Sequence, residues 1–411
     1  MNIFLFIDIL LALLAVMANG SNKRQFFYVS GGLLLILTCL HNGQGDPNGY
    51  GYDFPEYLAF FNGEGDSMYG SIESDGGYDL EWPYYVYCKL LGLFFQYDFI
   101  YIIGIGLTIG IPFLYLVRKY SNNPALSIFL LLTILNTQTY LFFLSVHRQM
   151  LANTFIFLAY IVIESDMQRK KTIALLLLFL ALSSHSSSFL IVPVLIVLWY
   201  MRINIRKSYA LIMLGVTFLA GLVINRLLSD EFRALFFLME DSESLERTVH
   251  YIVDDVYEEG DTSFNILFPL NAITAFMICF AKEEDLRSFN MKCMLFATSI
   301  YNLFCMIPLI DRSLTTFVLL GILGAVPVSG PITIEDDENS DASEELEFLP
   351  NNKNAEAEDI NEAEDINEAE EQNFIFVKAG LFVILIMQIY LAYKAYNNPS
   401  FRLLPFEFIW E

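Results

Sequence analysis

Three cationic or titratable side chains occur where an otherwise apolar chain can least accommodate them. Arg148 lies inside an almost unbroken apolar run over residues 126–163, and His185 stands among five serines. Arg312 directly precedes another apolar stretch. An ionisable group in hydrocarbon is costly unless it has a partner or lines a wet cavity. Together, the three side chains suggest a binding site for an anionic substrate.

The type of each side chain indicates the chemistry that it could perform. A guanidinium such as that of Arg148 binds phosphate or diphosphate in a bidentate fork. Gln149 and Asn153 repeat at helical spacing, so they share a polar helix face beside Arg148. His185 has a titration range suited to proton transfer or to a hydrogen bond with sugar or phosphate.

Structural roles remain open for the same residues. Arg148 can be a snorkelling arginine at the end of a span, and His185 can be a polar cap on a tight turn. Arg312 can form a local salt bridge with Asp311.

Two carboxylates mark the ends of a long Gly- and Tyr-rich segment. Asp53 follows Gly51-Tyr52, and Glu81 precedes Trp82-Pro83. A carboxylate at a membrane boundary can deprotonate an acceptor hydroxyl, although a solvated loop charge is the simpler role for either one. No phosphate-cradling loop, dinucleotide fingerprint or zinc motif occurs, and no basic patch favours nucleic acid. The sequence therefore predicts no metal, no cofactor and no nucleic-acid partner.

These residues must be positioned by membrane helices. The chain is 55% hydrophobic, and a span needs about 20 apolar residues. We expect an all-α polytopic integral membrane protein with about twelve transmembrane helices. The predicted spans are 2–18, 26–41, 99–117, 125–143, 147–164, 172–184, 188–201, 208–228, 264–281, 291–310, 313–329 and 374–394. The two short spans around His185 form a hairpin, because both of its outer flanks are basic.

Basic residues predict the orientation of the spans. Lys and Arg gather on alternate connections, around residues 23–24, 118–119, 169–171, 202–207 and 282–292. The positive-inside rule makes that side cytoplasmic. Both termini then lie outside, and Arg148, His185 and Arg312 lie together near the outer face.

Long polar segments separate the spans. Residues 42–98 form an acidic outer loop that ends in an amphipathic segment over 84–95, and residues 229–263 form a second outer loop. The formal net charge of −24 is mostly local, because seventeen acidic residues and one lysine lie between Glu335 and Glu371. The expected organisation is 1–41 first two spans, 42–98 outer loop, 99–228 transmembrane bundle, 229–263 outer loop, 264–329 transmembrane helices, 330–373 acidic low-complexity cytoplasmic linker and 374–411 last span and outer tail.

The five cysteines are expected to be small buried hydrophobes.

The pattern resembles the EpsG/Wzy family of polysaccharide polymerases over most of the chain. Gly51-Tyr-Asp53-Phe-Pro-Glu-Tyr57 is similar to the family's Gly-x-Asp-x-x-x-Tyr, and Glu81-Trp-Pro-Tyr84 to its Glu-Pro-Gly-aromatic element. Arg148-Gln149-Met-Leu-Ala152 resembles its Arg-Gln-x-x-Ala, and the serine-rich segment around His185 resembles its histidine hairpin. Arg312 falls where the family has an arginine, whereas His41 stands where an arginine commonly precedes the first element.

The resemblance implies a GT-C-like fold and a glycosyltransferase-type polymerase of undecaprenyl-diphosphate oligosaccharide repeat units at the outer face of the bacterial inner membrane. Arg148 and Arg312, with Gln149, would bind the diphosphate. Asp53 or His185 would accept the acceptor proton. Glu81 and Tyr57 would contact the substrate, and Tyr57 would stack on sugars with Tyr50, Tyr52 and Tyr84.

The expected partners are the lipid-linked oligosaccharide, membrane lipids, a flippase and a chain-length regulator. Two rival functions stay open: a transporter or flippase of lipid-linked glycans, and a membrane O-acyltransferase that uses His185.

Overall fold

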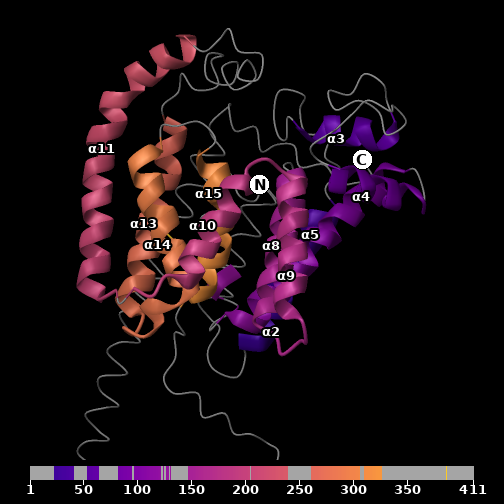
Figure 1. The fold of residues 1–411 in the computed structure, drawn as a ribbon, viewed down its shortest axis with the longest axis horizontal. Coiled ribbons are helices and arrows are strands. Elements are labelled where there is room, and N and C mark those ends of the chain that lie inside the picture. The colour runs from indigo at the N-terminus through magenta and orange to yellow at the C-terminus, as the bar shows by residue number, and fades with distance from the viewer. Residues whose placement is uncertain are drawn as a thin grey trace, which may run out of the picture.

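The computed structural model describes residues 23–40, 53–63, 82–94, 97–121, 124, 126–128, 130, 147–203, 205–238, 261–305, 310–325 and 386. Every regular element within these ranges is a helix (Figure 1), as the sequence predicted. The predicted spans 2–18 and 374–394, most of 125–143 and the acidic linker 330–373 lie outside the described residues.

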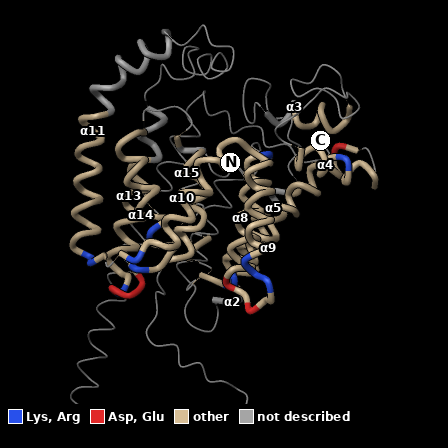
Figure 2. Tube along the Cα trace, viewed as in Figure 1, with Lys and Arg blue, Asp and Glu red and all other residues tan. Residues whose placement is uncertain are grey.

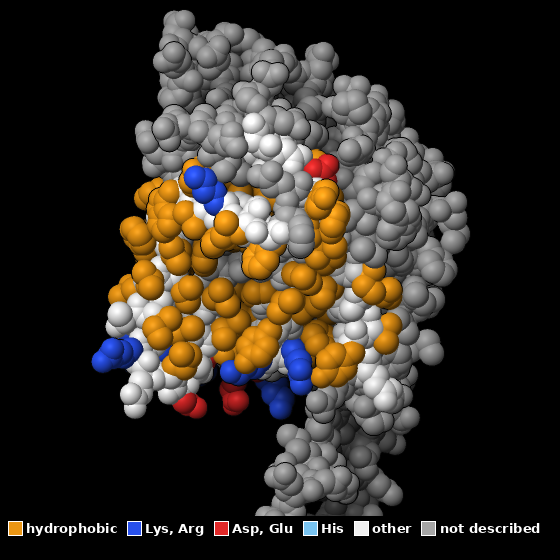
Figure 3. Space-filling view, turned by 90° about the vertical axis from the view of Figure 1, so that its right-hand side faces the viewer, with side chains coloured by type: hydrophobic (Ala, Val, Ile, Leu, Met, Phe, Trp, Pro, Cys, Tyr) orange, Lys and Arg blue, Asp and Glu red, His pale blue; other side chains and the backbone are white. Residues whose placement is uncertain are grey.

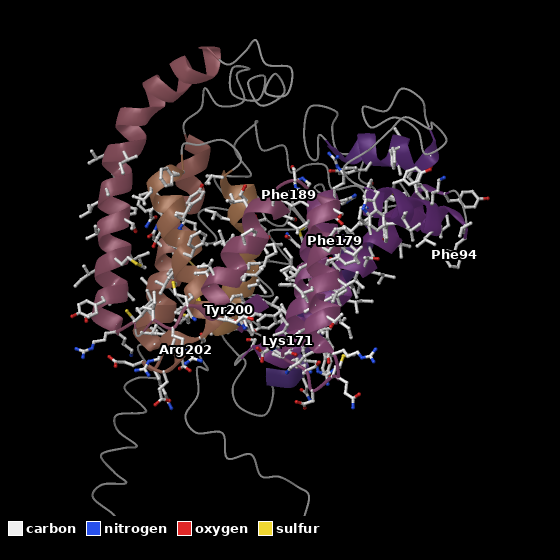
Figure 4. The ribbon with its side chains drawn as sticks, in the orientation of Figure 1. Phe94, Lys171, Phe179, Phe189, Tyr200 and Arg202 are labelled. Carbon is white, nitrogen blue, oxygen red and sulfur yellow. The ribbon has the colours of Figure 1, made fainter. Side chains whose placement is uncertain are left out.

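Three consecutive helices carry Arg148 and His185. They are α8 (His147–Ile163), α9 (Lys170–Ser184) and α10 (Ser188–Tyr200). Figure 4 shows α9 rising from Lys171 past Phe179, and α10 descending from Phe189 to Tyr200. The predicted hairpin around His185 is therefore confirmed, and its turn consists of the three residues between Ser184 and Ser188. The helices α8 and α9 pack extensively against each other, as expected for antiparallel helices joined by a short loop.

A second group of helices supports α8 from the other side. Here α5 (Asp98–Tyr120) packs against α2 (Lys23–Leu40) and against α8. The hydroxyl of Tyr120 donates to the carbonyl of Ile161 at 3.2 Å. Two short helices, α3 (Asp53–Asn62) and α4 (Trp82–Gly92), lie beside the beginning of α5 in Figure 1.

The rest of the bundle is formed by helices later in the chain. These are α11 (Lys207–Leu238), α13 (Asp261–Phe280), η3 (Asp285–Arg287), α14 (Phe289–Phe304), α15 (Ile310–Gly321) and η4 (Ile322–Gly324). Polar side chains join them, because Asn271 Nδ2 donates to Asn302 Oδ1 at 2.6 Å and Asn302 Nδ2 donates to Thr217 Oγ1 at 3.1 Å. Small residues at such crossings let helix backbones approach closely, as they do inside membranes.

The surface matches a membrane environment. Two helices, Asp98–Tyr120 and Lys207–Ile224, are long and apolar enough to cross a bilayer, and shorter apolar helices include Ser188–Tyr200 and Leu267–Phe280. Large hydrophobic side chains are exposed on several helices, and Leu175 and Leu219 are both more than 60% exposed. Figure 3 shows such side chains covering the middle of one lateral face. A water-soluble monomer rarely exposes a continuous apolar surface of this kind.

Charge is distributed unevenly along the bundle axis. In Figure 2 the described Lys and Arg residues lie mainly at the end where α11 begins and where α8 meets α9. Lys171 and Arg202 are both labelled at this end in Figure 4. The predicted basic connections therefore gather on one side of the bundle, whereas α8, α10 and α15 begin at the opposite end.

One helix is longer than expected, and one short helix was not expected. The helix α11 continues to Leu238, ten residues past its expected end at 228, and so enters the segment assigned to the second outer loop. Its 32 residues give a length of about 48 Å, which exceeds a hydrocarbon core of about 30 Å. The helix α3 was not expected at all. The total of twelve spans stays a prediction.

Candidate functional site

An aromatic cluster packs around the beginning of α8 at the end opposite the basic connections. Tyr57 of α3 stacks on the imidazole of His147, with ring centroids 5.2 Å apart and planes 25° apart. Tyr57 also meets Tyr84 of α4 edge-on at 5.5 Å. Phe60 and Phe61 of α3 and Tyr101 of α5 complete the same buried cluster. Aromatic pairs in these geometries add stability beyond their buried area, so α3 and α4 are fixed to the bundle here.

A chain of hydrogen bonds runs through this cluster to His147. The hydroxyls of Tyr84 and Tyr101 are 2.7 Å apart, and the Tyr101 hydroxyl lies 2.6 Å from His147 Nδ1. Burial raises the pKa of Tyr84 well above its usual value near 10, so its phenol stays protonated. The chain holds the imidazole of His147 in one orientation. No role was predicted for His147 from the sequence, although its position directly before Arg148 was a usable signal.

The cluster also positions Arg148. Its Nε donates to the hydroxyl of Tyr57 at 3.4 Å, and the guanidinium carbon lies 5.5 Å from the centre of the Tyr57 ring. This is the geometry of a cation–π contact. Arg148 is half-buried in the first turn of α8, where the helix macrodipole also favours a nearby anion. The described contacts thus tie Arg148 to Tyr57, from two sequence elements that were expected to share a site.

Gln149 and Asn153 connect this site to α15. Both side chains are buried, and Asn153 Oδ1 accepts a hydrogen bond from Thr316 Oγ1 at 2.6 Å. Thr316 lies one turn after Arg312 on α15, and Asn153 lies one turn after Gln149 on α8. Both helices run in the same direction from the same end of the bundle (Figure 1). The backbone of Arg312, in the first turn of α15, therefore lies near the first turn of α8. The side chain of Arg312 lies outside the described residues.

His185 occupies the turn between α9 and α10. Its Nδ1 accepts a hydrogen bond from the backbone N–H of Ser187 at 3.2 Å and lies 2.8 Å from Ser187 Oγ. Because Nδ1 accepts from an amide, the ring proton is on Nε2. His185 is 15 residues from the start of α9, and Arg148 is 15 residues before the end of α8. Since the two helices are antiparallel, both residues lie about 22 Å from the turn that joins them.

The two candidate carboxylates flank the cluster in sequence. Asp53 is the first residue of α3, one turn before Tyr57, and Glu81 directly precedes α4. Residues four apart on a helix share a face, so Asp53 lies on the same face of α3 as Tyr57. The side chains of Asp53 and Glu81 lie outside the described residues.

The sugar-stacking role expected for Tyr57 and Tyr84 stays a prediction, and both rings are buried in this structure. Tyr57 is 1% exposed and Tyr84 is 3% exposed, because each packs against other rings of the cluster. Neither ring offers an open face to a sugar in this structure. Tyr57 instead holds Arg148 and His147, whereas Tyr50 and Tyr52 lie outside the described residues.

All five cysteines are free thiols, and the expectation that they are buried is wrong for Cys279. Cys39, Cys88, Cys293 and Cys305 are buried, and Cys279 is exposed. Burial raises the pKa of the Cys88 thiol on α4 to about 12. Among the described residues, no group of three or more His, Cys, Asp or Glu side chains is arranged to hold a metal ion.

Comparison with known proteins gives one match. The family model of the EpsG family matches residues 33–330, a range that includes the aromatic cluster, Arg148, His185 and Arg312. No curated protein and no solved structure matches the chain.

Proposed function

Since the chain belongs to the EpsG family, we propose that it polymerises lipid-linked oligosaccharide repeat units into a surface polysaccharide. The family match supports a polysaccharide polymerase in general. The finer proposal is a glycosyltransferase-type reaction on undecaprenyl-diphosphate oligosaccharides at the outer face of the bacterial inner membrane, by a multi-pass protein with a GT-C-like fold. Apolar helices and the uneven distribution of basic residues support this placement.

The proposed reaction forms one glycosidic bond for each sugar–phosphate bond that breaks. A hydroxyl oxygen of the incoming unit attacks the anomeric carbon of the growing chain. The bond from that carbon to the diphosphate oxygen breaks, and the undecaprenyl diphosphate leaves with the electron pair. The hydroxyl proton passes to a base. No nucleotide is required, because the activated bond is already present in the lipid-linked donor.

The observation that carries this proposal is the contact between Arg148 and Tyr57. A cation fixed in advance stabilises developing negative charge better than one that must reorganise during the reaction. Tyr57 fixes Arg148 by a hydrogen bond and by its ring face. Arg148 would bind the diphosphate as the sugar–phosphate bond breaks, with Arg312 at the start of the neighbouring α15 and Gln149 beside it.

The proton acceptor is assigned to Asp53. The hydrogen bond from the Ser187 amide occupies Nδ1 of His185, so its Nε2–H is a donor. A donor suits a phosphate oxygen or a sugar oxygen, whereas a base needs a lone pair. Asp53 lies one turn from the Tyr57 that contacts Arg148, and Glu81 would bind the acceptor sugar nearby.

The same arrangement disfavours the rival functions. A flippase needs a polar path through both leaflets, and inverted repeats typically accompany such a path. Arg148, His185 and Arg312 instead belong to helix ends on one side of the bundle. An O-acyltransferase that uses His185 would need its acyl donor at that same outer side. The proposed partners, a flippase and a chain-length regulator, would act before and after polymerisation.

The test is polymer length on a gel in a strain that depends on this gene. Arg148→Ala, His185→Ala and Arg312→Ala should leave mainly single repeat units while the protein still reaches the membrane. Arg202→Ala, at the opposite end of the bundle, is the matched control and should retain long polymer. Long polymer from all three site variants would reject the proposed reaction.

A further inference from the structure

An apolar groove lies between α9 and α10 at the end of the bundle that carries the basic connections. It has a volume of about 350 Å³ and is bounded by residues of α8, α9, α10, α14 and α15. Apart from Lys170 and Lys171, all of its lining residues are apolar or aromatic. This groove is separate from the site around Arg148, which lies at the opposite ends of α8 and α9.

The groove lies between α9 and α10, which pack partly on different neighbouring helices. The helix α9 packs mainly on α8, and α10 packs also on α14 and α15. Leu175 of α9 and Ile196 of α10 both line the groove and are 65% and 41% exposed. The groove therefore opens sideways to the surroundings of the bundle.

The depth of the groove fits one leaflet of a bilayer. Its lining on α9 runs from Lys170 to Leu178, which corresponds to about 12 Å along the helix axis. Half of a hydrocarbon core is about 15 Å thick. Trp199 and Phe289 contact each other at 4.8 Å near the basic end, where aromatic rings typically mark the membrane–water boundary.

The two charged side chains that line the mouth of the groove, Lys170 and Lys171, are both positive. Lys171 is exposed, and Lys170 donates from Nζ to the carbonyl of Ser165 at 3.0 Å. Glu164 and Asp166 belong to the same connection and are also exposed, but neither lines the groove. Arg169 begins α9 with φ of 63°, a backbone conformation that non-glycine residues adopt only at some energetic cost. The connection between α8 and α9 thus contains a strained backbone position and three successive cations, Arg169, Lys170 and Lys171.

We infer that this groove binds an anionic glycerophospholipid of the cytoplasmic leaflet. One acyl chain lies along the apolar lining between α9 and α10, and the phosphate meets Lys171 and Lys170 at the mouth. Basic pockets between membrane helices on the cytoplasmic side recognise anionic lipid head groups in this way. The lipid wedges the lower ends of α9 and α10 apart and thereby supports the hairpin that carries His185.

The test measures lipids retained by the full-length protein in detergent, using native mass spectrometry with equimolar phosphatidylglycerol and phosphatidylcholine. Wild type should retain phosphatidylglycerol preferentially. Lys170→Ala with Lys171→Ala should lower that preference by roughly five- to thirtyfold, since each lysine near the membrane surface contributes up to about fivefold. Lys282→Ala with Arg287→Ala, at the same end but outside the groove, should leave it unchanged.

A second pair of variants tests the groove itself. Ile196→Trp places a large ring in the groove and should displace the bound lipid whatever its head group. Val197→Trp is the matched control, because Val197 is 59% exposed and does not line the groove. Equal retention of both phospholipids by wild type, equal effects of the two cation pairs, or unchanged binding in Ile196→Trp would each overturn the inference.

Discussion

Arg148 is the residue whose surroundings say most about its role. A snorkelling arginine would extend away from the bundle, whereas this one lies over a buried tyrosine ring that also stacks on His147. The sequence placed Arg148 and Tyr57 in one site because both fell in family-like elements. It could not predict that Tyr57 is a buried support, because burial depends on α3, which only tertiary contacts reveal.

Replacing Tyr57 by Phe separates the two contacts to Arg148. The ring face remains, and the hydroxyl that accepts from Nε is lost. We expect the polymerisation rate to fall by roughly three- to tenfold, since a long hydrogen bond to a charged group is modest. Arg148→Lys should cost more, about a hundredfold, because it removes the planar fork. The rates can be measured by single-turnover polymerisation in membranes, and a larger loss in Tyr57→Phe than in Arg148→Lys would contradict this order.

His185→Asn distinguishes a turn cap from a functional donor. An asparagine oxygen can accept from the amide two residues on, as Nδ1 of His185 does from Ser187. The variant should therefore reach the membrane at wild-type levels and still produce mainly single repeat units. Full-length polymer on a gel would show that His185 acts only as a cap.

At the scale of helices, the sequence predicted the α8–α9–α10 segment within about two residues at each end. Long apolar runs bounded by basic or serine-rich turns left little ambiguity there. It missed α3, a ten-residue helix in an acidic Gly- and Tyr-rich segment, because its stability comes from ring packing against α4, α5 and α8. It also ended α11 too early, because the sequence becomes polar after Ile224 while the helix continues.

The crossing of α11 and α14 depends on Gly221. A Cβ atom at this position would overlap the backbone carbonyl oxygen of Asn302, whose side chain joins α11 and α13. Gly221→Leu should destabilise the protein by at least about 1–3 kcal/mol through overpacking, seen as a lower apparent Tm in detergent. Gly215→Leu is the control, because a Cβ there meets nothing within 4 Å. Equal Tm values for the two variants would contradict this packing.

At the scale of the whole molecule, the basic connections gather at one end, and the proposed catalytic residues belong to helix ends at the other. The positions of Lys and Arg along the sequence predicted this arrangement without any knowledge of helix packing. The number of spans did not follow so directly, because hairpin helices of 13 to 17 residues are shorter than a full crossing.

The orientation can be tested with a native cysteine. Cys279 is exposed near the basic end, where its carbonyl accepts from Lys207 Nζ at 3.2 Å. Cys88 should stay silent, because its pKa near 12 keeps the buried thiol protonated at pH 7 to 8, and only the thiolate reacts. An impermeant maleimide should label Cys279 in inverted vesicles and not in intact cells. Labelling in intact cells that Cys279→Ser abolishes would reverse the orientation.

The packing of α3 against α4 has a consequence for how such a polymerase can diversify. Phe60 stacks on Tyr84 at 5.9 Å, so the two helices that flank residues 64–81 are held together independently of what joins them. Insertions and exchanges are best tolerated between anchored, adjacent ends. The sequence between the two helices can therefore lengthen or change while the helices that hold Arg148 keep their places.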